Sequence, residues 1–131
     1  TSLTVKNSLL RFGMMSANGK MGFVKESIQE LSARLRQHKS FNIVVVDSIQ
    51  YSQINYKEYI RFKESFPNKL IIFISHAVGK MPKGKTANAV MFDADLKIWV
   101  QGYVAYSKGR YIGSTGRYVI WEDGAREAGM I

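Results

Sequence analysis

The sequence predicts an α/β protein with a mostly parallel, helix-flanked sheet and antiparallel strands at its carboxyl-terminal end. An unbroken apolar run, Ile43–Val46, ends in Asp47. Such runs are typical of strands buried on both faces of a helix-covered parallel sheet. A second run, Leu70–Ile74, follows after a helical segment. Beyond residue 95 the links between strands are too short for helical crossovers, so those strands are expected to be antiparallel.

Helices are expected over residues 3–12, 23–38 and 55–64. The second has an apolar stripe at three- to five-residue spacing, formed by Phe23, Ile28, Leu31 and Leu35. Residues at this spacing lie on one face of a helix, which we expect to pack on the sheet.

The last strands are expected at about residues 95–101, 103–107 and 117–121, each an antiparallel neighbour of the next. The 131 residues are expected to form one domain. The tail, residues 123–131, is predicted to be loosely ordered, because chain ends often lack packing partners.

Composition favours a cytoplasmic protein with a nucleic-acid partner. Nineteen basic and ten acidic residues give a net charge of +9, an excess that attracts phosphates, although it also promotes solubility. The chain has no cysteine, so it has no disulfide framework and no thiolate metal site. No apolar run approaches the length needed to span a membrane.

Asp47 and Ser48 follow the first predicted strand. Ligands of parallel sheets bind beyond the carboxyl ends of the strands, so this position suits a magnesium-bound nucleotide. The alternative is structural: Asp47 caps the next helix or begins a turn. His76 follows the second strand, and its alternative is also structural: it is a hydrogen-bonded polar residue at the end of a buried strand.

Several segments together resemble the RecA-like ATPases, and most closely the RadA/Sms branch of recombination proteins. They are the Walker B-like Val-Val-Asp-Ser-Ile-Gln ending at Gln50, the strand that precedes His76, Asp95 at the start of a strand, and Ser-Lys-Gly-Arg-Tyr-Ile-Gly-Ser-Thr ending at Thr115. In order and spacing they span most of residues 3–123. The last segment departs from the Lys-Asn-Arg-Phe-Gly signature of that branch.

The resemblance implies ATP and Mg²⁺ as cofactors of the parent protein. Asp47 would then hold a magnesium-bound water, Ser48 would lie beside the nucleotide, and His76 would sense the terminal phosphate. On the hairpin, Lys108 and Arg110 would reach the nucleotide of a neighbouring subunit. The resemblance also implies a homo-oligomeric ring or filament.

DNA, expected to be single-stranded, is the implied macromolecular partner. The loop over residues 79–88 corresponds to one that faces DNA in RecA-like rings. Three lysines in that loop and an arginine further on are the expected phosphate contacts: Lys80, Lys83, Lys85 and Arg117. Tyr118 would extend this surface, since aromatic rings stack on bases. The alternative for the lysines is a solvated basic loop.

Residues 79–86 also match the P-loop pattern G-x-x-x-x-G-K-T. In that register Gly79 and Gly84 would let backbone amides wrap a phosphate, while Lys85 and Thr86 would reach phosphate and magnesium. However, the variable positions include two lysines and a methionine, and the following helix is short. These features favour the DNA-facing loop over the P-loop.

The sequence contains no convincing P-loop near its amino end, where this family carries one. We therefore expect a fragment or truncated form of a DNA recombination, repair or replication ATPase, inactive in hydrolysis by itself because phosphate positioning dominates such catalysis. Two alternatives remain: a non-catalytic DNA-binding or ring-docking module, and a small P-loop nucleotide phosphotransferase.

Overall fold

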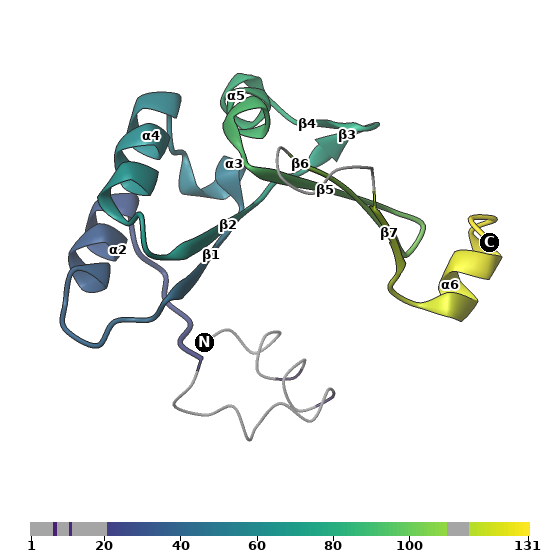
Figure 1. Cartoon of the computed structure of the whole chain (residues 1–131), viewed down its shortest axis with the longest axis horizontal. Coiled ribbons are helices and arrows are strands. Elements are labelled where there is room, and N and C mark those ends of the chain that lie inside the picture. The colour runs from purple at the N-terminus through teal and green to yellow at the C-terminus, as the bar shows by residue number, and fades with distance from the viewer. Residues whose placement is uncertain (1–6, 8–10, 12–20, 110–115) are drawn as a thin grey trace. The chain divides into compact units, whose positions relative to one another are not determined.

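A computed structural model describes Asn7, Arg11 and residues 21–109 and 116–131 (Figure 1). The chain divides into two compact units, Thr1–Ser40 and Phe41–Ile131. Apart from Asn7 and Arg11, the helix expected over residues 3–12 lies outside the described residues.

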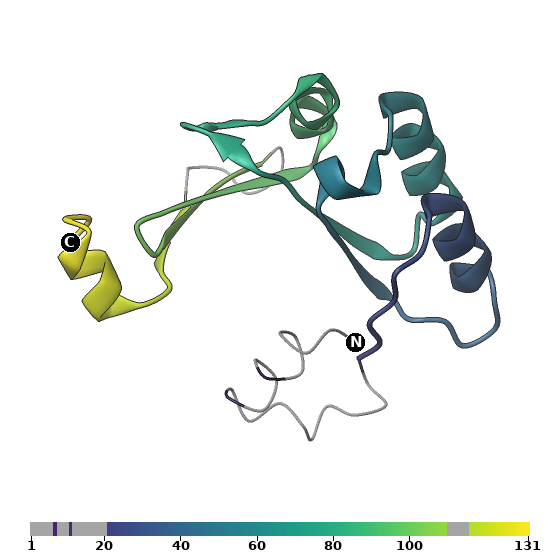
Figure 2. The same cartoon turned by 180° about the vertical axis from the view of Figure 1, so that it is seen from behind.

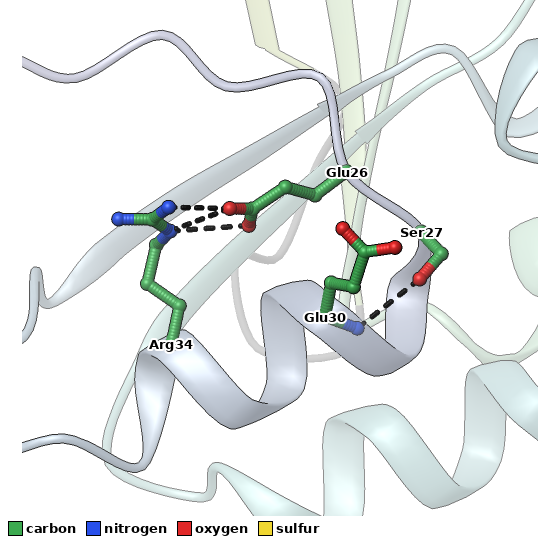
Figure 3. Close-up of polar contacts among 4 residues, drawn as sticks. All are labelled: Glu26, Ser27, Glu30 and Arg34. Atoms are coloured by element: carbon green, nitrogen blue, oxygen red, sulfur yellow. Dashed lines mark hydrogen bonds and ion pairs between the residues drawn. The ribbon is translucent and has the colours of Figure 1, made fainter.

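The first unit contains helix α2, Ile28–Leu35, which is shorter than the expected 23–38. It begins at Ile28 because the Ser27 hydroxyl accepts a hydrogen bond from the Glu30 backbone N–H at 3.2 Å and so caps the helix (Figure 3). Arg34 Nε donates to Glu26 Oε1 at 2.9 Å. This hydrogen bond from the guanidinium lowers the pKa of Glu26.

The second unit begins with a parallel pair, β1 (Ile43–Asp47) and β2 (Leu70–Ile74), in which Ile43 lies opposite Leu70 and Asp47 opposite Ile74. Both strands were predicted, and their parallel pairing is confirmed. One face of the pair contains Val44 and Val46, which are buried.

The opposite face is exposed within the second unit. Its apolar members are Ile43, Val45, Leu70, Ile72 and Ile74. The expectation that β1 is buried on both faces was therefore wrong for this unit, because the helix that packs on the pair, residues 56–65, contacts the face of Val46 and Phe73.

The crossover from β1 to β2 contains α3 (Ile49–Ser52) and α4 (Tyr56–Ser65). A capping box starts α4, because Asn55 Oδ1 accepts from the Glu58 N–H and Glu58 reaches back to the Asn55 N–H. The helix packs on β2 through Tyr59 and Phe62, whose rings lie 5.2 and 6.3 Å from that of Phe73. The third expected helix, over residues 55–64, is confirmed.

A small antiparallel hairpin follows β2 and consists of β3 (Ala77–Val78) and β4 (Met81–Pro82). Helix α5 (Lys85–Asp93) lies beside it (Figure 1 and Figure 2). At the end of α5, Asp93 accepts a 2.6 Å hydrogen bond from Tyr59 Oη and forms an ion pair with Lys63. These contacts connect α5 to α4. Burial, with this hydrogen bond, raises the pKa of Tyr59.

The remaining strands form an antiparallel sheet in the order β5 (Leu96–Gln101), β6 (Val104–Gly109) and β7 (Gly116–Val119). All three were predicted as antiparallel neighbours, and the pairing is confirmed. Gly102 and Tyr103 both have positive φ, which matches the right-handed twist of a two-residue hairpin turn.

The α/β class is confirmed, but a single continuous sheet is not observed. The described residues form three separate sheets: β1 with β2, β3 with β4, and β5 with β6 and β7. Short links join β3 to β4 and β5 to β6, and these sequence neighbours pair with each other, whereas helix α5 separates β4 from β5.

The tail begins with helix α6, Glu122–Glu127, where loose order was expected. Gly124 and Ala125 are buried. The Trp121 ring meets Tyr103 edge-on at 4.9 Å, and the absence of a side chain on Gly124 leaves room for both rings. Packing against the β5–β6 turn therefore orders this helix.

Candidate functional site

The candidate site lies at the carboxyl ends of β1 and β2. Their register places Asp47 opposite Ile74, so Asp47 and the Ser75–His76 pair leave adjacent strands at the same edge. This is the arrangement predicted from the sequence. Asp47 lies on the same face as Val45 and Ile72, which the second unit leaves exposed. Its carboxylate is therefore accessible from that side.

Ser48 caps the helix that follows β1, a role that the sequence analysis considered for Asp47. Its hydroxyl accepts from the Tyr51 N–H at 3.2 Å and caps α3, and its side chain is buried, 4% exposed. The Asp47–Ser48 peptide bond is cis. Since Ser48 supplies the cap, Asp47 is not needed for it.

Gln50 connects the two strand ends to the next loop, and sequence reasoning missed this role. Its Nε2 donates to Ser75 Oγ at 2.8 Å and to the Lys83 carbonyl at 2.7 Å. Its Oε1 accepts from the His76 N–H at 3.1 Å. The amide thus uses both its donors and its acceptor across three segments. Its position three residues after Asp47 was the available signal.

His76 is fixed through its backbone while its imidazole is exposed. Its N–H is bonded to Gln50, and its carbonyl accepts from the Lys83 N–H at 2.8 Å. The second bond closes the β3–β4 hairpin at its base. A group binding near the imidazole would therefore be one residue from the hairpin.

Residues 79–86 form a hairpin turn and a helix start rather than a phosphate-wrapping loop. Gly79 follows β3 with φ 61°, and Gly84 precedes α5 with φ 96°. The Lys83 N–H, which a P-loop would offer to phosphate, is bonded to His76. Lys85 and Thr86 thus lie in the first turn of α5, and the residues before them do not form a loop of backbone N–H groups that could wrap a phosphate.

The predicted basic residues fall into two groups. Lys80, Lys83 and Lys85 are exposed on the hairpin and at the start of α5. Lys108 lies on β6 and Arg117 on β7. Both are on the same face of the sheet, because Arg117 pairs with Tyr106, two residues before Lys108. Arg110 lies outside the described residues.

Tyr118 does not extend the surface of Arg117, contrary to expectation. Consecutive residues of a strand point to opposite faces, so the two side chains of β7 are separated by the sheet. Arg117 Nη2 instead donates to the Met130 carbonyl at 3.0 Å. Trp99 and Tyr106 lie on the same face as Arg117.

Within the described parts of the chain, no group of three or more His, Cys, Asp or Glu residues is placed to hold a metal ion. None of the described helices is long and apolar enough to cross a membrane. Comparisons with protein-family models, curated proteins and solved structures found no match.

Proposed function

We propose that this chain is part of a RecA-like, RadA-type ATPase core that acts on DNA in recombination, repair or replication. The observation that carries the proposal is the shared edge at which Asp47 and His76 leave adjacent parallel strands. Ligands of parallel sheets bind at this edge. The basic hairpin leaves from the same edge, and this supports a nucleotide position close to a DNA-facing loop.

Asp47 fits an outer contact with Mg²⁺. Magnesium prefers hard oxygen ligands and keeps several waters, and an exposed carboxylate at a strand end can bind such a water. One carboxylate does not hold the ion alone, so phosphate oxygens of ATP have to supply further ligands. Weak Mg-ATP binding by residues 1–131 alone is therefore expected.

Gln50 supports communication between the two positions. Its amide bonds the His76 N–H on one side and the Lys83 carbonyl on the other. A shift of His76 towards a phosphate would change both hydrogen bonds and so bias the hairpin. Coupling of this kind requires two arrangements of the loop with different nucleotide affinity.

A second candidate is a non-catalytic DNA-binding or docking module. The exposed apolar face of β1 and β2 favours it: Ile43 is 61% exposed and Leu70 is 57% exposed. Faces of this kind mark interaction surfaces. The phosphotransferase alternative has less support, because residues 79–86 are engaged in the hairpin.

The test is DNA-stimulated ATP hydrolysis by the full product of the gene that encodes this chain. We expect Asp47→Asn to reduce hydrolysis by about 10²-fold or more, because the magnesium contact is weakened. Asp123→Asn, on α6, is the matched control. Unchanged hydrolysis in Asp47→Asn would contradict the proposal. Tight ATP binding by residues 1–131 that Lys85→Ala abolishes would instead favour the phosphotransferase.

A further inference from the structure

One face of the β5–β7 sheet combines aromatic and basic side chains. Cross-strand pairing places Trp99 opposite Tyr106, and Tyr106 opposite Arg117. Lys97 and Lys108 form the adjacent pair on the same face. We call these five residues the Trp99 face. They come from three strands that contain no Asp or Glu.

The two rings of this face are stacked, with centroids 5.0 Å apart and planes inclined by 28°. The ammonium group of Lys80, from the β3–β4 turn, lies 4.9 Å from the centre of the Trp99 ring. Trp99 and Tyr106 are partly exposed, and Lys108 and Arg117 are exposed. A cation therefore covers a ring that remains accessible to solvent.

We infer that the Trp99 face binds single-stranded nucleic acid, with a base stacked on Trp99 in place of Lys80. A flexible lysine over an indole is held by a modest attraction, so a base is able to displace it. The displaced ammonium and the cations of the face then meet backbone phosphates. Single strands fit better than a duplex, because the stacking surface needs an unpaired base.

Charge complementarity identifies the occupant. Lys80 lies over the Trp99 ring. Lys97, Lys108 and Arg117 are on the same face as the two rings, with no carboxylate in the strands, and the Lys97 and Arg117 side chains also bond backbone carbonyls of Ala94 and Met130. Stacking and phosphate attraction together are the means by which proteins hold single strands without reading their sequence. This inference deepens the proposed function by naming a DNA surface, but its test requires no nucleotide.

The experiment follows the fluorescence of Trp99. The chain has two tryptophans, so Trp121→Phe leaves Trp99 as the reporter. Titration with oligothymidylate of about 15 nucleotides should quench it to saturation. Polyphosphate, which has the charge but no bases, should compete at low salt without quenching.

Variants separate stacking from charge. Trp99→Leu should weaken oligothymidylate binding by about 5- to 100-fold. Trp99→Phe should retain most of the affinity, and it is the control that distinguishes a loss of stacking from a folding defect. Lys108→Gln should lower the slope of log K against log salt by about 0.7. Lys69→Gln, outside the face, is the control for this change.

Binding without quenching of Trp99, or binding unaffected by Trp99→Leu, would overturn the inference, as would failure to bind at low salt. The outcome is independent of the ATPase proposal. Asp47→Asn should leave oligothymidylate binding unchanged, and the Trp99 variants should bind poorly whether or not the full protein hydrolyses ATP.

Discussion

Gln50 makes three hydrogen bonds with one side-chain amide, to Ser75, His76 and Lys83. Each bond joins a segment distant in sequence, so the residue fixes the geometry of the strand edge next to Asp47. Ser48 adds the cap of α3 immediately before it. Gln50 and the Ser48 cap thus position the strand edge that holds Asp47 and His76.

We predict that Gln50→Leu destabilises the protein by about 1–3 kcal/mol, because the polar groups it served lose their partners. Gln101→Leu, at an exposed position on β5, should change the free energy of unfolding by less than about 0.5 kcal/mol. Urea unfolding of both variants measures the difference. Equal stability of the two would show that the Gln50 bonds contribute little in solution.

At the scale of elements, α6 depends on a position where no side chain fits. A Cβ on Gly124 would lie 2.2 Å from Trp121 Cε3 and 2.6 Å from Tyr103 Cδ2. The helix therefore docks with its glycine against two rings, and the Met130 N–H bonds back to the Ala125 carbonyl at 2.8 Å. The sequence analysis did not predict this packing, because it expected a segment near the end of the sequence to be loosely ordered.

Gly124→Ala tests the docking because two effects oppose each other. Alanine favours a helix over glycine by about 1 kcal/mol, whereas overpacking costs about 1–3 kcal/mol. We expect net destabilisation, together with a change in the near-ultraviolet circular dichroism of Trp121. Glu127→Ala in the same helix is the control for helix propensity. A stabilised Gly124→Ala variant would show that α6 is not docked as described.

At the scale of the whole molecule, β1 and β2 present an exposed apolar face in the second unit. Val45 and Ile72 lie opposite each other on it, 54% and 41% exposed. Asp47 ends the same face. A partner covering it would also approach the proposed nucleotide position.

Replacing Val45 and Ile72 by threonine should reduce binding of the dye ANS while changing the free energy of unfolding by less than about 1 kcal/mol. Threonine keeps the preference for strands, so the loss of dye binding reports surface polarity. Dye fluorescence and urea unfolding are the measurements. Destabilisation by more than about 2 kcal/mol would mean that this face is buried in solution.

Local sequence patterns predicted β1, β2, α4, the strands β5–β7 and the strand edge, but not α3, α6 or the β3–β4 hairpin. The apolar runs before Asp47 and Ser75 predicted β1 and β2, and short links predicted the antiparallel order of β5–β7. Local patterns suffice for these features, because the period of a strand and the length of a link are properties of adjacent residues.

Which distant side chains meet is evident from the fold and not from the sequence. The contacts of Gln50 with Lys83, of Lys80 with Trp99 and of Gly124 with Tyr103 span many residues. The division into three sheets likewise follows from strand pairing. These features depend on register and on which elements pack, and packing energies between distant segments leave no periodic signal in the sequence.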